Sequence, residues 1–258
     1  MDLGLNGKTA LVGGASMGIG FGIAHTLASE GARVVITARR EKGLHEAAER
    51  LRSETGADIV PIQADCRRAE DCARVIDHVA GLGGADILVN NDGAPPLGEI
   101  TSFDDTAWAK AVEQNLMYVV RMARGLVPGM IAKGGGSILN ITAISAIQPI
   151  PTFGLSVATW GGVIGYAKTL SLEVAKHNIS VNTICPGYIE TQRLEKVFAA
   201  GGEDPDKMRA DLIAEIPMGR IGTVDDIASM VALLVSPRGR YVTGTAIQVD
   251  GGLLRGLR

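Results

Sequence analysis

The sequence has few of the residues from which disulfide frameworks and metal centres are built. Its 258 residues include three cysteines, Cys66, Cys72 and Cys185, with no Cys-x-x-Cys pair among them. An odd number of cysteines without that spacing argues against a disulfide framework and against structural zinc. The four histidines lie in helix-like segments without a second ligand at metal-binding spacing. We therefore expect reduced thiols in a cytoplasmic protein and no metal site.

Long apolar runs and blocks of like charge are also missing. The formal net charge is −3 and no run of Lys or Arg occurs, which argues against nucleic acid or a membrane as a partner. The amino terminus has an acidic residue at position 2 and reaches a glycine-rich turn at once, unlike a signal peptide. The apolar run 154–165 is too short and too rich in glycine to span a bilayer.

Short runs of β-branched residues alternate with helical segments along the chain. The runs predict strands at residues 9–12, 33–37, 59–63, 87–89, 137–141, 180–184 and 246–249. The segments between them predict helices at residues 18–30, 42–55, 69–80, 106–132, 156–177 and 223–235. This alternation is typical of an α/β fold, here a single doubly wound, Rossmann-type domain over residues 1–258. We expect a mainly parallel seven-stranded sheet with helices on both faces.

The segment 186–222 interrupts this alternation. Glycine and proline flank a short predicted helix near 193–200, and the segment directly follows the carboxyl end of a strand. Doubly wound folds bind ligands outside the carboxyl ends of their strands, and functional loops extend from that edge. We interpret 186–222 as a substrate lid.

A glycine-rich turn, GGASMGIG at residues 13–20, joins the first predicted strand to the first helix. Glycine allows a tight turn and a close approach of the backbone to a pyrophosphate. The start of the helix then offers free N–H groups to the phosphates. The turn therefore predicts a dinucleotide site at this edge of the sheet.

Four further motifs accompany this turn: NNDG at 90–93, QNL at 114–116, PGYIET at 186–191 and VDGG at 249–252. Together they resemble the short-chain dehydrogenase/reductase (SDR) family over essentially the whole chain, and within it the chain is similar to 3-oxoacyl-carrier-protein reductases. The resemblance implies that a nicotinamide dinucleotide binds across these motifs. The residues at cofactor-binding positions are Gly14, Ser16, Met17, Gly18, Ile19, Gly20, Arg39, Asp65, Cys66, Asn91, Gly93, Trp160, Pro186, Gly187, Ile189 and Thr191.

The end of the second strand decides between the two cofactors. Relatives that bind NAD place an acidic residue there, whereas this chain has Ala38 followed by Arg39 and Arg40. A guanidinium can hold a ribose 2′-phosphate through two N–H groups, so we favour NADP(H) over NAD(H). Two points stand against this: Arg39 can equally be a solvated residue at a helix start, and Met17 stands where NADP-preferring relatives often carry a basic residue.

The resemblance also implies a catalytic Ser, Tyr and Lys, with an Asn on the preceding helix. In the family the Tyr protonates the developing alkoxide, a Lys four residues later lowers the pKa of that Tyr, and the Ser holds the substrate oxygen. Counting back from PGYIET without gaps, the Tyr position is Ser156, the Lys position is Trp160 and the Ser position is Ala143. Asn115 alone matches the family.

No other register restores the Tyr and Lys pair. The residues four positions after the four tyrosines are Met122, Leu170, Gln192 and Thr245, so the sequence contains no Tyr-x-x-x-Lys. Ser145, two residues past Ala143, is an alternative for the missing Ser on a shifted register. The sequence therefore predicts that three of the four catalytic groups are absent.

Asn115, Ser156 and Tyr188 remain as catalytic candidates, and each has a weakness. Ser156 has no neighbouring base in the sequence. Tyr188 follows a Pro-Gly turn and is the best surviving proton donor, or else an apolar wall of the pocket. Asn115 can instead satisfy backbone groups at a helix kink. Trp160 either stacks on the cofactor or fills the space of the lost Lys.

Two departures from the family are expected to be neighbours in the fold. The Thr that ties the first strand to the turn after the fourth is Gly13 here, and the Ala of the family's NNAG motif is Asp92. We hypothesise that Asp92 supplies a polar contact in the space left by Gly13. The rival hypothesis is that this carboxylate weakens cofactor binding.

These observations predict an atypical NADP(H)-linked oxidoreductase that reduces a small carbonyl or enone compound and takes its proton from water or Tyr188. Two alternatives stay open: a cofactor-binding but inactive partner subunit or regulator, and a non-redox isomerase, lyase or cyclase. The expected partners are a small-molecule substrate and further subunits. The resemblance implies that the helices at 106–132 and 156–177, rich in small residues, form a homodimer or homotetramer, or a hetero-oligomer with an active paralogue.

Overall fold

A parallel sheet of seven strands runs through the centre of the protein. The computed structural model describes residues 1–200 and 204–256, and orders the strands β3-β2-β1-β4-β5-β6-β7. Their bounds are Thr9–Val12 for β1, Arg33–Ala38 for β2, Ile59–Gln63 for β3, Ile87–Asn90 for β4, Gly136–Ile141 for β5, Ile179–Pro186 for β6 and Ala246–Val249 for β7. The order reverses beside β1, because β2 and β4 are its two neighbours.

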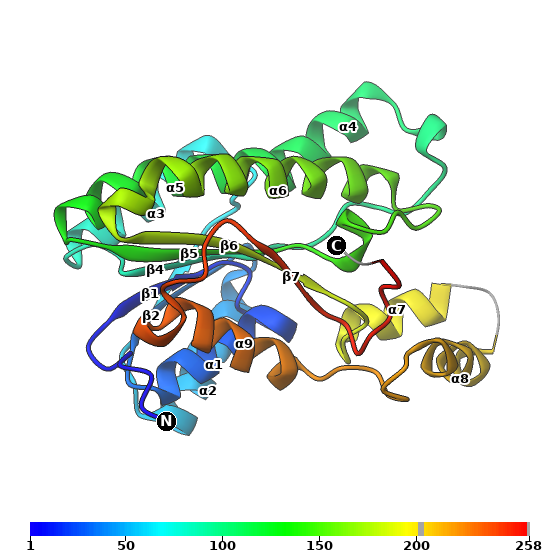
Figure 1. The fold of residues 1–258 in the computed structure, drawn as a ribbon, viewed down its shortest axis with the longest axis horizontal. Helices are drawn as coiled ribbons and strands as arrows, with labels where there is room; N and C mark the ends of the chain where they lie inside the picture. Colours follow the sequence, from blue (N-terminus) through cyan, green and yellow to red (C-terminus); the bar gives the residue numbers. More distant parts are fainter. Residues whose placement is uncertain (201–203, 257–258) are drawn as a thin grey trace.

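Helices cover both faces of the sheet (Figure 1). One layer contains α1 (Gly18–Ser29), α2 (Glu41–Thr55) and α9 (Val224–Val235), and the other contains α3 (Ala69–Gly81), α4 (Asp105–Val112), α5 (Tyr118–Ala132) and α6 (Gly154–Val174). Two further helices, α7 (Gln192–Ala200) and α8 (Pro205–Glu215), extend beyond one end of the sheet. Among the described residues, no helix combines the length and apolar character needed to cross a membrane.

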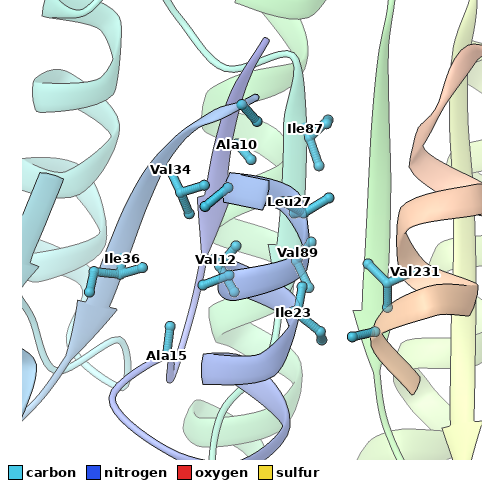
Figure 2. Packing of buried hydrophobic residues seen from close by; sticks show 14 of the residues in the cluster. Ala10, Val12, Ala15, Ile23, Leu27, Val34, Ile36, Ile87, Val89 and Val231 are labelled. Atoms are coloured by element: carbon cyan, nitrogen blue, oxygen red, sulfur yellow. The ribbon is translucent and has the colours of Figure 1, made fainter. Parts of the chain in front are cut away.

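Alternate residues of the central strands enter two separate cores. Ala10 and Val12 of β1 belong to one core with residues of α1 and α9, among them Ile23 and Val231, and Figure 2 shows Val231 on its own helix, farther from β1 than Ile23 is. Leu11, between them in the sequence, belongs to the second core, beneath α3, α5 and α6. Because both faces of the strands are buried, they read as continuous β-branched and apolar runs rather than as an alternating pattern.

The fold predicted from the sequence is confirmed, and two helical predictions need correction. The single helix expected at 106–132 is α4, a π-helical turn over Glu113–Met117, and then α5. The sequence analysis missed α8, which starts at Pro205 and has no fully buried residue; its apolar residues Met208, Leu212 and Ile213 are half-buried against a small cluster with Leu194 and Phe198. The predicted lid at 186–222 contains α7 and α8, and its residues 201–203 lie outside the described part of the chain.

Candidate active site

A cleft of about 860 Å³ opens along the carboxyl ends of β1, β2 and β4. Its wall consists of the glycine-rich turn, the end of β2, the loop 91–97 after β4, and residues 191–193 at the start of the lid. The cleft therefore lies where the strand order reverses, the position at which doubly wound sheets bind ligands.

The glycine-rich turn presents backbone donors to this cleft. Gly14 and Gly18 both have a φ of +58°, a conformation that other residues rarely adopt. Helix α1 begins at Gly18, and within the described chain it has neither a side-chain cap nor an acidic residue in its first turn. Its first N–H groups and its positive dipole end are thus available to an anion. This arrangement fits the pyrophosphate of a dinucleotide.

Two arginines stand at the end of β2. Arg39 and Arg40 are exposed and line the cleft, and Ala38 beside them offers no carboxylate to ribose hydroxyls. Arg67 donates to Asp65 through two N–H groups, which holds the pKa of Asp65 below its ordinary value, with a smaller contribution from Arg39. The cleft thus has a positive end at Arg39, where a phosphate can bind.

The structure brings most of the predicted cofactor-binding residues together. The cleft is lined by Gly14, Ser16, Met17, Gly18, Ile19, Gly20, Arg39, Cys66, Asn91, Gly93 and Thr191. Trp160, Pro186, Gly187 and Ile189 line an adjoining cavity instead. Asp65 lies beside the cleft but is not part of its wall. Its carboxylate accepts from Arg67, and its N–H donates to Asp71.

The adjoining cavity has a volume of about 190 Å³. The connection between β5 and α6, the end of β6 and helix α7 enclose it, mainly with the apolar side chains Ile144, Ile150, Phe153, Leu194 and Val197. Arg193, which the sequence analysis missed, lines both the cleft and this cavity. The sequence could have indicated Arg193 as a site residue, because it lies two residues after Thr191 in the predicted lid. A small, largely apolar substrate suits such a cavity.

The three positions at which the resemblance implies catalytic groups differ in their surroundings. Ala143 and Trp160 line the adjoining cavity. Ser156 is 1% exposed, its Oγ has no hydrogen-bond partner among the described residues, and it is not part of that cavity's wall. Ser145 does line the cavity, and its Oγ is also buried without a partner in the part of the chain that the structure describes. The structure therefore places Ser145, but not Ser156, in the wall of this cavity.

Asn115 is buried in the π-helical turn, where its side chain joins two helices. Its Nδ2 donates to Oγ1 of Thr159, at 2.8 Å, and Thr159 directly precedes Trp160 on α6. Asn115, Trp160 and Asp92 also line a third, much smaller cavity. The sequence analysis offered, as a structural role for Asn115, a hydrogen bond to backbone groups at a helix kink. In the structure its side chain instead bonds to the side chain of Thr159.

Tyr188 lines the substrate cavity and is half-buried. Burial raises the pKa of Tyr188, and the negative charge of Glu215 adds to the increase. The hydroxyl therefore stays protonated at neutral pH. It can donate a hydrogen bond to a substrate oxygen, but it gives up its proton less readily than an ordinary phenol does.

The hypothesis that Asp92 fills the space left by Gly13 is wrong, because Tyr118 fills it. A Cβ atom at Gly13 would lie 2.0 Å from the Tyr118 hydroxyl and 2.7 Å from the Asn91 carbonyl oxygen. Burial strongly raises the pKa of Tyr118, and a hydrogen bond with the Asn91 backbone opposes this increase. Asp92 instead lines the cleft and both cavities.

The cysteines and the other potential metal ligands do not form a centre. Cys66, Cys72 and Cys185 are free thiols and all three are buried. Across residues 1–200 and 204–256, no three His, Cys, Asp or Glu side chains are grouped so that they could hold a metal ion. The chemistry of the site therefore has to be sought in the cleft and its adjoining cavity.

Comparison with known proteins agrees with this geometry. A family model described as enoyl-(acyl carrier protein) reductase matches residues 14–254. The chain is 34% identical over 252 residues to 3-oxoacyl-[acyl-carrier-protein] reductase FabG of Vibrio cholerae, covering 97% of this chain and 99% of that protein. It is 36% identical over 249 residues to dehydrogenase/reductase SDR family member 4 of Caenorhabditis elegans, covering 96% and 95%.

Solved structures give the same picture. The L-sorbose reductase of Gluconobacter frateurii, complexed with NADPH and L-sorbose, is 38% identical, has a TM-score of 0.95, and matches over 100% of both chains. A variant of actinorhodin polyketide ketoreductase with NADPH is 33% identical and has a TM-score of 0.91, with 97% of this chain and 98% of that chain covered.

The packing of Tyr118 against Gly13 gives a prediction about stability. Gly13→Ala should lower the free energy of unfolding by about 1–3 kcal/mol, the usual cost of overpacking a core. The cost should be smaller in the Tyr118→Phe background, because the closest contact is then removed. Urea unfolding of the four proteins measures both effects. Gly129→Ala, on α5 with open space around it among the described residues, is the matched control. An equal cost in both backgrounds would contradict the assigned contact.

Proposed function

Because this chain belongs to the short-chain dehydrogenase/reductase family of oxidoreductases, we propose that it binds NADP(H) in the cleft and acts on a small carbonyl or enone compound in the adjoining cavity. The observation that carries this proposal is the continuity of the two spaces. The start of α1 and Arg39 lie in one cleft, and that cleft shares the wall residues 91–94 with the apolar cavity. The two NADPH complexes among the similar structures support the choice of cofactor.

The residues of the cleft suggest how the dinucleotide is held. The backbone N–H groups at the start of α1 receive the pyrophosphate, and the Arg39 guanidinium receives the 2′-phosphate. When bound, the nicotinamide supplies or accepts a hydride. Residues of the lid, including Thr191 and Arg193, close the cleft above the glycine-rich turn.

The proposed catalytic set is reduced in comparison with the family. Ala143, Ser156 and Trp160 occupy the Ser, Tyr and Lys positions that the resemblance implies. The hydroxyls of Ser145 and Tyr188 remain to position the substrate oxygen, and the proton comes from Tyr188 or water. General acid catalysis typically contributes about 10²–10⁴-fold, so its loss slows the reaction without abolishing it.

A second candidate function is a cofactor-binding but inactive partner subunit or regulator. It is favoured by the burial of the Ser156 hydroxyl and by the raised pKa of Tyr188, which burial causes first and Glu215 second. A non-redox isomerase, lyase or cyclase is compatible with the same cavity. Hydride transfer from bound NADPH to a ketone distinguishes the reductase from both, and co-purification with a relative that has Tyr-x-x-x-Lys identifies the partner subunit. Localisation in the cytoplasm stays a prediction.

Cofactor preference provides the first test. NADPH should bind more tightly than NADH, and Arg39→Ala should weaken NADPH binding by roughly 10–100-fold, since hydrogen bonds to charged groups contribute about 1.5–3 kcal/mol. The margin should shrink with added salt, because the contact is exposed. Fluorescence titration measures both cofactors. Lys42→Ala, an exposed cation near the start of α2, controls for general charge effects. Equal affinities of the wild type for NADPH and NADH would refute the assignment.

Restoring the missing groups provides a second test. Ser156→Tyr alone should have little effect, because without a nearby cation the new phenol keeps a pKa near its reference of about 10. Trp160→Lys removes bulk and adds that cation, and Ala143→Ser adds an anchor for the substrate oxygen. The triple variant should therefore oxidise NADPH with activated ketones faster than the wild type does, and the gains should be non-additive. If the triple variant binds NADPH but oxidises it no faster than the wild type with any ketone, the inactive-subunit and non-redox proposals become better supported than the reductase proposal.

Assembly through α5 and α6 is a further proposal. On α6, a Cβ built at Gly161 or Gly165 meets no described atom within 4 Å, and Leu172 is 73% exposed, so one face of this helix is small and apolar. We expect a dimer or tetramer in sedimentation experiments at micromolar concentration. Gly165→Arg should shift it toward monomer, whereas Gly43→Arg, at an open position on α2, should not. A wild type that sediments only as a monomer would count against this interface.

A further inference from the structure

Two of the three thiols, those of Cys66 and Cys72, lie together beside the cofactor cleft. Cys66 is in the turn after β3 and lines the cleft, and Cys72 is in the first turn of α3. The Cys72 thiol donates to the Cys66 carbonyl oxygen, with 3.2 Å between Sγ and oxygen. A hydrogen bond also joins the two thiols to each other. The two sulfurs are therefore neighbours in the reduced protein.

Backbone hydrogen bonds on both sides hold this pair in place. The Asp65 N–H donates to the Asp71 carboxylate, at 2.8 Å, and the Arg68 N–H donates to the Asp65 carbonyl oxygen, at 2.8 Å. The Cys72 N–H donates to the Arg68 carbonyl oxygen, at 3.1 Å. The turn is thus already closed onto the start of α3, so a bond between the two sulfurs costs little further chain entropy.

The third thiol is placed quite differently. Cys185, near the end of β6, has its Sγ 3.2 Å from the Thr142 Oγ1. Among the described residues, it lines neither the cleft nor the two cavities of the site. A small oxidant in the cleft can therefore reach Cys66, which is 7% exposed, but not Cys185, which is 0% exposed.

The hydrogen bond between the thiols also makes their acidities unequal. It lowers the pKa of Cys72, with a smaller contribution from the Arg121 guanidinium and against the effect of burial. The same hydrogen bond, followed by burial, raises the pKa of Cys66. The first proton therefore leaves Cys72, and the Cys66 thiol then donates to the Cys72 thiolate. Transfer of that proton along the hydrogen bond places the thiolate, which is the reactive form, on Cys66 in the cleft wall.

We propose that Cys66 and Cys72 form a reversible disulfide when a peroxide enters the cleft. The Cys66 thiolate attacks one peroxide oxygen, the O–O bond breaks, and Cys66 becomes a sulfenic acid. With hydrogen peroxide, the leaving hydroxide takes up the proton that the pair first lost. The Cys72 sulfur then attacks the sulfenic sulfur, the S–O bond breaks, and the oxygen leaves as water with the Cys72 proton. The two thiols are oxidised by two electrons in total, and hydrogen peroxide is reduced to two waters.

The disulfide also acts on the cofactor cleft, and this step rests on the proposed function. A disulfide holds its sulfurs about 2 Å apart, much closer than two thiols in hydrogen-bond contact. Bond formation therefore moves Cys66, and with it a part of the wall that a dinucleotide in the cleft contacts. We expect oxidation to weaken NADPH binding. A dinucleotide in the cleft should in turn cover Cys66 and slow its oxidation.

Peptide mapping of the full chain tests the thiol chemistry without any cofactor. Trypsin cleaves after Arg67 and Arg68, so a bond between Cys66 and Cys72 links two otherwise separate peptides, residues 53–67 and 69–74. The folded wild type, treated with hydrogen peroxide and then alkylated, should give this linked pair, and dithiothreitol should remove it. Cys185→Ser should give the same pair, whereas Cys72→Ser should not.

The wild type alone decides whether the bond forms, so the result does not depend on how well a variant folds. Three results with the folded wild type would overturn the proposal. These are thiols that stay reduced until the protein is unfolded, a Cys66 that is oxidised to a sulfinic acid without the linked pair, and a linked pair that contains Cys185.

Fluorescence titration with NADPH tests the effect on the cleft. The oxidised wild type should bind NADPH about tenfold more weakly than the same sample after dithiothreitol. Saturating 2′,5′-ADP, which lacks the nicotinamide half and is not oxidised by the peroxide, should slow formation of the linked pair. Equal NADPH affinities in the two states would overturn the effect on the cleft. If the reduced wild type binds neither NADPH nor 2′,5′-ADP, the proposed function fails, while the peptide map still decides whether the disulfide forms.

Discussion

The contact between the end of β1 and the loop after β4 joins the main parts of the site. Asn91 donates from Nδ2 to the Gly13 carbonyl, at 3.0 Å, and the Tyr118 hydroxyl occupies the space beside Gly13. The glycine-rich turn, the loop that carries Asp92 and the start of α5 therefore meet at one point. A side chain at position 13 would disturb all three, which explains why a glycine and a buried tyrosine occur together.

Most of the fold, and the cofactor end of the site, could be predicted from the sequence. The strands are buried on both faces and are therefore visible in the sequence as β-branched runs. A glycine-rich turn directly after a strand indicates a dinucleotide site. Both signals are local. Helix α8 gave a weaker signal, because it is short and only Met208, Leu212 and Ile213 pack, half-buried, against a small cluster outside the main cores.

What could not be predicted depends on contacts between distant segments. Tyr118 and Gly13 are far apart in the sequence, and nothing in either segment shows that a hydroxyl from α5 fills a gap beside β1. The π-helical turn at Asn115 could not be predicted from the sequence either, since such a turn leaves the helical pattern of apolar residues nearly unchanged. The wall position of Arg193 depends on how the lid folds back over the cleft.

The three positions at which the resemblance implies catalytic groups are packed differently from one another. A Ser in place of a Tyr would leave a hole if nothing else changed, yet Ser156 is 1% exposed and, within the described chain, lines none of the three spaces of the site. Trp160 supplies bulk one turn further along α6, where the family has the thinner Lys side chain, and it lines the substrate cavity itself. Thr159 beside it receives the hydrogen bond of Asn115, so this part of α6 is tied to the π-helical turn. Ser145, Tyr188 and Asp92 are among the polar residues in the wall of the largely apolar cavity next to it.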